Sequence, residues 1–412
     1  MRRRTAARNK QSRSNRSWVL RGGIAAIAIA LGYLSITQSL GYAMAKGSPE
    51  KAYAIAPSDG RIGALLAYRL WAADGGPAQR DKAARIAWDS LVDEPLAVPA
   101  VATLAFDAEL RGRSAEAKKL FVHSDALSRR ELLTQLWLIE DAVRHDDVPL
   151  AIRHYDIALR TSPPAFDLLF PVLAGAVSDP AIFKVLVPTL ARRPLWGEAF
   201  IRYLSTSGPD PRRTAHFFRL LVANRITVPE VDRAGVVNAL VAANAFNDAW
   251  AYYQTLRSSA DRRQSRDAEF EQQLDAPTAF DWTPRMSDFG LTATIQRTDK
   301  SGVFDFSAPS TVGGIVLEQL QLLPPGRYQL AGRSTVIGQT PQSAPYWVLI
   351  CTDGRELGRV AVPNASQDNG RFAGAFTVDK SCPAQVLRLI VRPSSAVSGV
   401  SGQIEHVLLR PL

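Results

Sequence analysis

The stretch that decides the fold is RHDDVPLAIRHYDIALRTSPP, residues 144–164. Asp147 stands where a helix N-cap is expected, and Pro149 follows in the first turn, where proline is tolerated. Apolar and small side chains then recur at helical spacing, at Leu150, Ala151, Tyr155, Ala158 and Leu159. His145 and His154 lie nine residues apart, so they lack the i, i+4 spacing of a helical pair of metal ligands. The stretch therefore predicts an amphipathic helix rather than a metal or acid–base site.

A period of 34 residues surrounds this helix. Ala117 and Phe121 recur 34 residues later as Ala151 and Tyr155. The pattern resembles the tetratricopeptide repeat, a helix pair in which small residues allow close approach and a large one fills the groove. The residues that match its packing positions are Leu138, Ala151, Tyr155, Ala158 and Pro163, preceded by Ala117 and Phe121. We expect five or six helix pairs stacked as a solenoid over residues 47–258, and the resemblance implies that this solenoid binds a protein partner.

The N-terminus combines a basic tail with an uncharged stretch. Residues 1–21 hold eight Lys and Arg and no acid, so the rest of the chain has a net charge of only +2. Residues 22–45 contain no charged side chain and are long enough to cross a bilayer as a helix. Positive charge on one side predicts a cytoplasmic N-terminus, with everything downstream exported. The alternatives are a signal peptide cleaved after Ala45 and nucleic-acid binding by the tail, and the uncharged stretch favours the membrane.

The last third of the chain has the pattern of a β domain. Residues 259–276 are polar and charged, and they are predicted to form a connecting helix or linker. From 277 to 412, short alternating runs between Gly and Pro predict eight or nine strands. Their number and spacing favour an antiparallel β-sandwich, with a jelly roll preferred to an immunoglobulin-like topology. Cys351 and Cys382 are a disulfide candidate if this domain is exported, the alternative being two buried thiols.

Four runs of this domain carry a second resemblance: FDWTP at 280–284, LPPGRYQL at 323–330, YWVLIC at 346–351 and CPAQVLRLIV at 382–391. They look like the sandwich module that ends many proteobacterial tetratricopeptide proteins, which are often associated with exopolysaccharide assembly. That module is similar to jelly-roll carbohydrate-binding domains. Together with the charges around the apolar stretch, the resemblance implies a single-pass inner-membrane protein with a cytoplasmic N-terminus and a periplasmic bulk, whose sandwich contacts a polysaccharide.

A sugar-binding surface needs aromatic faces and polar partners, because sugar C–H groups stack on rings while hydroxyl groups need hydrogen bonds. Trp282, Tyr346 and Trp347 are the candidate platform, and each has a core role as its alternative. Tyr346 and Trp347 are adjacent, so in a strand they point to opposite faces. The polar side chains available beside them are Arg333, Asp353, Arg355, Asn364, Gln367, Asp368 and Asn369.

The sequence contains no motif for catalysis or for a cofactor. We find no nucleophile elbow, phosphate-binding loop, dinucleotide-binding glycine pattern or zinc-protease motif, and the five histidines are scattered. We therefore expect a non-enzymatic scaffold or accessory protein in envelope or secreted polysaccharide assembly or export, without metal or cofactor. The alternatives are a general envelope scaffold whose sandwich is only a protein interface, and a glycan-processing enzyme with an unrecognised site.

Overall fold

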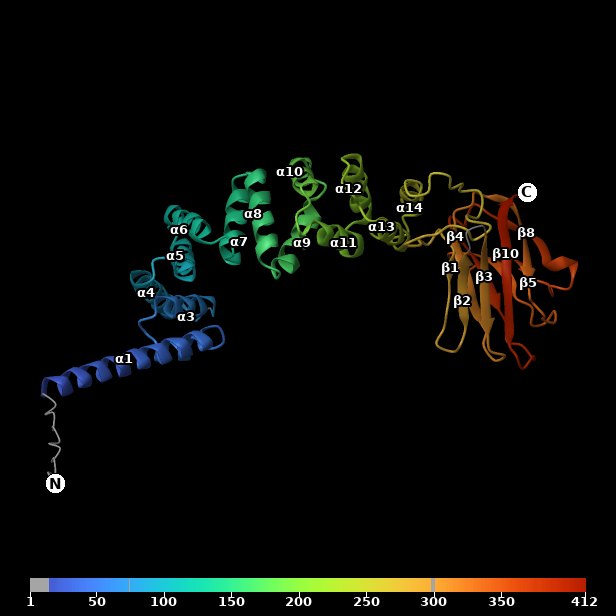
Figure 1. The fold of residues 1–412 in the computed structure, drawn as a ribbon. Coiled ribbons are helices and arrows are strands. Elements are labelled where there is room, and N and C mark those ends of the chain that lie inside the picture. The colour runs from blue at the N-terminus through green and yellow to red at the C-terminus, as the bar shows by residue number, and fades with distance from the viewer. Residues whose placement is uncertain (1–14, 74, 298–300) are drawn as a thin grey trace, which may run out of the picture. The chain divides into compact units, whose positions relative to one another are not determined.

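The computed structural model describes residues 15–73, 75–297 and 301–412 (Figure 1). Residues 1–14 of the predicted basic tail, which spans residues 1–21, therefore lie outside the described residues. Within the described residues, fourteen α-helices precede two antiparallel sheets, which confirms the predicted α-then-β fold class. The chain divides into two compact units, Met1–Leu169 and Phe170–Leu412, and the division falls inside a helix of the predicted repeat region.

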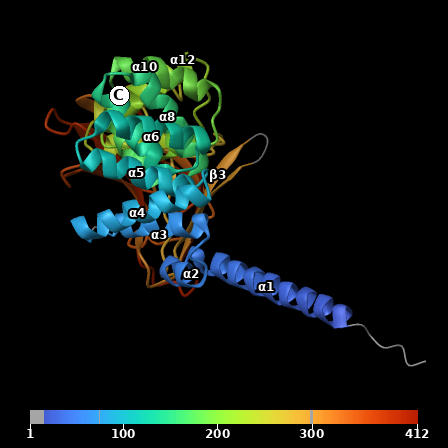
Figure 2. The same cartoon turned by 90° about the vertical axis from the view of Figure 1, so that its left-hand side faces the viewer.

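The first unit begins with the long helix α1 (Asn15–Ala45), whose apolar side chains face outward along most of its length. Figures 1 and 2 show α1 extending away from the helix pairs that follow it. The part from Trp18 to Ala45 is 28 residues long, and its length and composition suffice to cross a membrane. A signal sequence near an N-terminus fits the same description.

The helices after α1 form hairpins at the period read from the sequence. They are α2 (Pro49–Ile55), α3 (Gly60–Ala72), α4 (Pro77–Asp93), α5 (Val98–Leu110), α6 (Ser114–Leu127), α7 (Leu132–Arg144) and α8 (Val148–Thr161). Helices α3 and α4, α5 and α6, and α7 and α8 pack as pairs. Val98 and Leu132 begin α5 and α7, 34 residues apart, and the same offset separates the starts of α6 and α8. This arrangement is a helical repeat.

The side chains assigned to repeat packing lie between these helices, with one exception. Ala117 and Phe121 are fully buried, and Phe121 stacks on Trp137 of the next helix with 4.3 Å between ring centroids. Leu138, Ala151, Tyr155 and Ala158 are buried as well. Pro163 is exposed after the end of α8. Small residues at the crossing points let the helix backbones approach, and the aromatic rings fill the remaining space.

The polar side chains in and around α8 contact neighbouring backbone and side chains. Asp147 caps α8 by accepting a hydrogen bond from the Leu150 N–H at 3.0 Å. His154 is buried, contacts Gln135 Oε1 through Nδ1 at 2.8 Å, and has a pKa lowered by burial. His145 is exposed at the end of α7 and its Nδ1 lies 2.7 Å from the Asp141 carbonyl oxygen. The two histidines therefore contact different groups, the Asp141 carbonyl and the Gln135 side chain, and do not form one site.

The second unit continues with helix pairs of similar length. They are α9 (Ala165–Ala176), whose start belongs to the first unit, α10 (Pro180–Ala191), α11 (Gly197–Ser207), α12 (Pro211–Ala223), α13 (Glu230–Ala242) and α14 (Phe246–Tyr253). Asp179 and Asp210 cap α10 and α12, each followed by a proline at the first helical position. Helix α13 packs against α11, α12 and α14.

The β domain is a sandwich of two five-stranded antiparallel sheets (Figure 1). The strands are β1 (Thr283–Pro284), β2 (Thr292–Arg297), β3 (Gly302–Ala308), β4 (Gly314–Gln321), β5 (Gly326–Thr335), β6 (Tyr346–Cys351), β7 (Glu356–Ala361), β8 (Arg371–Val378), β9 (Gln385–Val391) and β10 (Val400–Pro411), with a 3₁₀ turn η1 (Asp368–Gly370) before β8. One sheet has the order β1-β4-β9-β6-β7 and the other β2-β3-β10-β5-β8. Alternate residues of both sheets meet in one apolar core.

A disulfide bond joins Cys351, at the end of β6, to Cys382, just before β9. The two Cα atoms lie 5.7 Å apart, and both side chains are buried. Because β6 and β9 are neighbours in one sheet, the bond closes the end of that strand pair. It links positions 31 residues apart in the sequence.

Residues 259–276, predicted as a connecting helix or linker, are built into the sandwich as turns and extended segments. Phe270 is fully buried in the apolar core, and the Ser265 N–H donates to the Leu409 carbonyl at 2.9 Å. The guanidinium of Arg266 is also buried and donates to the carbonyl of Phe280 at 2.8 Å and to Gln321 Oε1 at 2.7 Å. Burial lowers the pKa of Arg266 to about 10. The segment therefore belongs to the sandwich rather than to a free connection.

Candidate functional site

Two of the three predicted platform aromatics are core residues, so the prediction of a sugar-binding role for them is wrong. Trp347 is 0% exposed and Trp282 is 4% exposed, and their ring centroids lie 5.7 Å apart between the sheets. Trp282 also donates its indole N–H to the Asp267 carbonyl at 2.9 Å. Trp347 of β6 and Trp282, the residue before β1, both belong to the apolar core between the sheets, where no ligand reaches them.

Tyr346 lies on the outer face of its sheet, but its ring is already covered. The guanidinium carbons of Arg359 and Arg392 lie 4.8 Å and 4.4 Å from the ring centroid. Arg359 belongs to β7 and Arg392 follows β9, the two strands that flank β6. Arg359 is in turn held by Glu356 through two hydrogen bonds. The ring of Tyr346 is therefore stacked between cations and is not an open sugar platform.

The opposite outer surface of the sandwich is polar and lacks aromatic side chains at its outward positions. It is the outer side of the sheet β2-β3-β10-β5-β8, and we call it the polar sheet face. Alternation along the strands places these side chains outward: Thr292, Thr294, Gln296, Asp305, Ser307, Gln329, Arg333, Thr335, Arg371, Thr377, Ser401, Gln403 and Glu405. Gln403 donates to Asp305 Oδ2 at 2.9 Å, which links β10 to β3.

A hollow of about 880 Å³ lies at one end of the polar sheet face. Pairing in the sheet aligns Arg333 on β5 with His406 on β10 and with Arg371 on β8, and all three side chains line the hollow. Asp368 and Asn369 of η1 complete its rim with left-handed backbone angles, φ 46° and 52°. Donors and acceptors thus converge on one concavity.

A bulge in β10 shapes this hollow. The pairing of β10 with β5 shifts between Ile404 and His406, so Glu405 is an extra residue on β10. Glu405 forms an ion pair with Arg333 at 3.3 Å, while His406 lines the hollow beside it. The bulge therefore brings an acid and an imidazole to the same arginine. Side chains of these types can form hydrogen bonds with hydroxyl and carboxylate groups.

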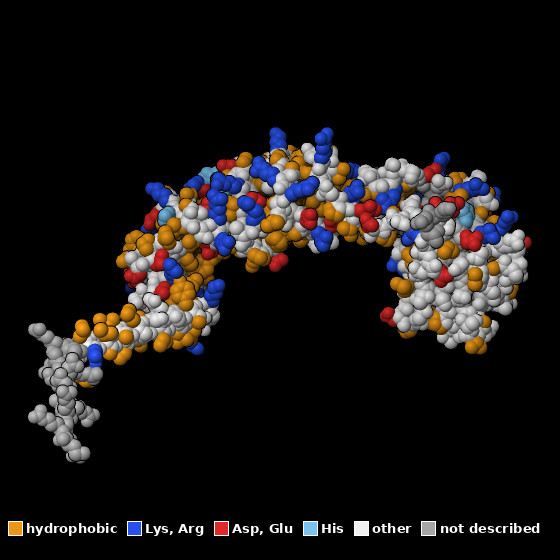
Figure 3. All heavy atoms as spheres, in the orientation of Figure 1, with side chains coloured by type: hydrophobic (Ala, Val, Ile, Leu, Met, Phe, Trp, Pro, Cys, Tyr) orange, Lys and Arg blue, Asp and Glu red, His pale blue; other side chains and the backbone are white. Residues whose placement is uncertain are grey.

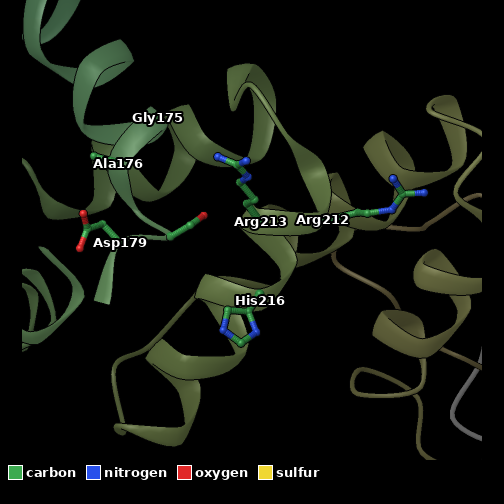
Figure 4. A pocket seen from close by; sticks show the side chains of 7 residues that line it. Gly175, Ala176, Asp179, Arg212, Arg213 and His216 are labelled. Atoms are coloured by element: carbon green, nitrogen blue, oxygen red, sulfur yellow. The ribbon is translucent and has the colours of Figure 1, made fainter. Parts of the chain in front are cut away.

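A second hollow, of about 560 Å³, lies on the helices of the second unit (Figure 4). It is lined by Gly175, Ala176, Ser178, Asp179, Arg212, Arg213 and His216. Arg212 pairs with Asp248 at 2.6 Å, and Figure 4 shows its side chain pointing away from Asp179. Arg213 pairs with Asp210 at 3.3 Å. Both arginines already hold carboxylates, so this hollow is less suited to an anionic ligand.

Within the described residues, no group of three or more His, Cys, Asp or Glu side chains is arranged to hold a metal ion. Of the polar residues named from the sequence, Arg333, Asp368 and Asn369 meet in one hollow. Asp353 and Arg355 pair with each other at 3.1 Å in the turn between β6 and β7. Sequence reasoning missed Arg371, His406 and Gln403. Alternation in β8 and β10 was the available signal for Arg371 and Gln403, whereas His406 faces the hollow because of a bulge that alternation does not reveal.

No protein-family model matches this chain, and no curated protein matches it. Solved structures with partial similarity include the enzymatically active domain of tailspike protein 4 of bacteriophage CBA120, at 18% identity over 33% of this chain and 20% of that one, with a TM-score of 0.24. The tandem CBM22 domain of Paenibacillus barcinonensis Xyn10C is similar at 12% identity over 36% and 45% of the two chains, with a TM-score of 0.24. Human IFIT1 bound to PPP-AAAA is similar at 14% identity over 52% and 57%, with a TM-score of 0.26. The chain spans less than two thirds of each of these structures, and these likenesses define no family.

Proposed function

We propose that this protein is a membrane-anchored accessory protein that acts without catalysis in the assembly or export of an envelope or secreted polysaccharide. Its sandwich binds the glycan through the polar sheet face, and its helical repeats bind a protein partner. The anchor raises the local concentration of both sites at the membrane surface.

The observation that carries this proposal is the convergence of Arg333, Arg371, His406, Asp368 and Asn369 on one hollow. A glycan chain presents many hydroxyl groups, and each needs a donor or an acceptor when it leaves water. The face supplies both kinds of group, and its rows of threonine, serine and glutamine extend the contact along the sheet. This face takes the place of the aromatic platform expected from the sequence.

Polysaccharide affinity gels test the glycan site. The full chain, purified in detergent, is run through native gels that contain one neutral or acidic bacterial polysaccharide each. Retardation by at least one polysaccharide is expected, and the double variant Arg333→Ala/His406→Ala should abolish it. Arg355→Ala is the matched control, because Arg355 is an exposed arginine in the β6–β7 turn and outside the hollow. Equal retardation of the hollow variant and the wild type would contradict the proposal.

The proposed location rests on α1 and on the charges that precede it. Eight basic residues before the apolar stretch favour a cytoplasmic N-terminus and an exported bulk in the periplasm of a Gram-negative cell. Protease added to intact spheroplasts should then digest the chain beyond Ala45. Complete protection of that portion would contradict the export.

Exposed apolar residues in the sandwich favour a second candidate, a general envelope scaffold whose sandwich is a protein interface. Phe289 is 81% exposed and Val397 is fully exposed, with Met286 exposed in the same loop as Phe289. The loops that carry them connect β1 to β2 and β9 to β10, and the strand directions place both loops at one end of the sandwich. Exposed apolar clusters mark interaction sites. This candidate predicts no retardation on any polysaccharide.

A further inference from the structure

Two arginines occupy backbone positions that normally belong to glycine. Arg193 follows the C-cap of α10 and Arg225 follows that of α12, with φ angles of 52° and 61°. A left-handed residue at this place ends many helices, and it is usually Gly or Asn because a Cβ atom is unfavourable there. The equivalent positions after α5 and α13 have the expected types, Gly112 and Asn244.

The helix ends with Arg225 and Asn244 share the same hydrogen bonds. After α12 the Ile226 N–H donates to the Leu221 carbonyl at 2.9 Å, and after α13 the Ala245 N–H donates to the Leu240 carbonyl at 2.9 Å. Arginine is therefore not required for this helix ending. A strained residue that the fold does not need points to a role for its side chain.

Both arginines line one hollow of about 490 Å³ between the end of α10 and the end of α12. The apolar part of its lining is Leu190, Ala191, Pro194, Leu195, Ile201 and Ile226. Leu195 is 89% exposed. In the described part of the chain, neither arginine side chain forms an ion pair or a side-chain hydrogen bond. The hollow thus combines two available guanidinium groups with an apolar lining.

Basic residues outnumber acidic residues in the helices that carry the hollow. Residues 179–225 contain Lys184, Arg192, Arg193, Arg202, Arg212, Arg213, Arg219 and Arg225 against Asp179, Glu198 and Asp210, and two of these arginines, Arg212 and Arg213, are already paired with Asp248 and Asp210. All eight basic side chains are exposed, and Figure 3 shows Lys and Arg gathered over α10 and α12. Glu198 lines the hollow as well, so its local balance is two cations to one anion. Complementarity therefore calls for an anionic ligand.

We propose that this hollow binds an acidic peptide segment of a partner protein, in which carboxylates pair with Arg193 and Arg225 and an aliphatic side chain packs among Leu190, Leu195 and Ile201. The inference rests on the proposed binding of a protein partner by the helical repeats. Guanidinium groups pair with carboxylates through two parallel hydrogen bonds. The apolar lining favours a peptide over a polyanionic glycan or nucleic acid, because those polymers bring no aliphatic side chain to fill it.

The test is fluorescence anisotropy with the full chain in detergent and a labelled eight-residue peptide of alternating glutamate and leucine. Saturable binding is expected. Replacing glutamate by glutamine, or leucine by serine, should weaken it at least tenfold. The double variant Arg193→Gly/Arg225→Gly should also weaken binding at least tenfold, while its melting temperature stays equal or rises because glycine fits the backbone angle.

Asn244→Gly is the matched control, since Asn244 has the same backbone angle but does not line the hollow. It should raise the melting temperature without changing peptide binding. A second double variant, Arg193→Asn/Arg225→Asn, keeps residues that tolerate this angle and should lose binding in the same way. The proposal is overturned if the peptide does not bind or if both double variants bind it as the wild type does.

Competition separates a peptide site from a general anion site. Alginate, a polyuronate, should displace the peptide poorly. Equal binding of the glutamate–serine and glutamate–leucine peptides, together with full displacement by alginate, would overturn the peptide proposal in favour of a polyanion site. This result is distinct from the affinity-gel result, because the gel variants lie on the sandwich and these variants lie on α10 and α12.

Discussion

Tyr253, at the end of α14, donates its hydroxyl hydrogen bond to the buried carboxylate of Asp281 at 2.7 Å. The other carboxylate oxygen accepts from the Thr278 N–H and from the Thr278 hydroxyl, both at 2.8 Å. Trp250 of α14 packs edge-on against Phe280, with ring centroids 5.3 Å apart. The last helix and the start of the sandwich therefore share polar and apolar contacts within one unit.

This contact predicts that Tyr253→Phe destabilises the second unit. The variant removes a hydrogen bond to a buried carboxylate, and we expect a loss of about 1.5–3 kcal/mol in free energy of unfolding. Urea unfolding, monitored by hydrogen exchange of the backbone amides in β4, measures this loss of free energy. Tyr252→Phe is the control, because Tyr252 is equally buried and its hydroxyl makes no side-chain hydrogen bond in the described residues. Similar losses in the two variants would show that the Asp281 contact is not the cause.

Phe270→Ala should be more damaging than a change at an exposed phenylalanine. Phe270 is 0% exposed and packs on Trp282 and Phe304, so its removal leaves a cavity that costs about 3–5 kcal/mol. Phe289→Ala, at an exposed position, should change stability by less than about 0.5 kcal/mol.

Because Phe270 is part of the core of the sandwich, a fragment of residues 277–412 should be less stable than one of residues 259–412. Equal thermal stability of the two fragments would contradict the finding that residues 259–276 are part of the sandwich.

Removal of the disulfide should weaken the sandwich without altering its fold. In the chain-entropy account, a crosslink between positions 31 residues apart is worth about 3–4 kcal/mol. The variant Cys351→Ser/Cys382→Ser should therefore melt at a lower temperature than the oxidised wild type, and the reduced wild type should behave like the variant. Free thiols at Cys351 and Cys382 in protein purified without reducing agent would refute the oxidised state that this prediction assumes.

The buried imidazole of His154 makes the first unit sensitive to acid. Burial lowers the pKa of His154 below 6.5, so the unfolded chain binds a proton more readily than the folded chain. The stability due to the neutral imidazole is complete above pH 6.5 and is lost as the pH falls below it. His154→Gln should reduce the loss of thermal stability between pH 7.5 and pH 5.5. The same slope in variant and wild type would assign the pH dependence to other groups.

Much of the helical region could be predicted because its determinants are local. The 34-residue period placed Ala117 and Phe121 at helix crossings, and Asp147 and Pro149 marked the start of α8. The conformations of Arg193 and Arg225 could not be predicted, because glycine is the residue that usually marks a helix end of this kind in a sequence. The apolar hollow between them depends on two helix ends that lie 32 residues apart.

In the sandwich, the alternation of apolar and polar residues predicts the strands but does not predict which face of each strand is buried. Alternation separates the two faces of a strand, but it does not say which face meets the other sheet, so it leaves Trp347 of β6 as a platform candidate although this residue is buried in the core. Trp282 precedes β1, outside any strand, and is buried as well. Arg266 and Phe270 lie in the polar stretch 259–276, which is predicted to form a connecting helix or linker, yet both side chains are buried in the sandwich. The bulge at Glu405 changes the facing of one residue, which periodicity of two does not reveal.

Hydrogen–deuterium exchange of the full chain, with and without a polysaccharide that retards it in gels, tests the glycan site most directly. The account predicts slower exchange in β5, β8, β10 and η1, with β6 and β7 unchanged. Protection confined to β6 and β7, around Tyr346, or an absence of any protection in the sandwich, would contradict it.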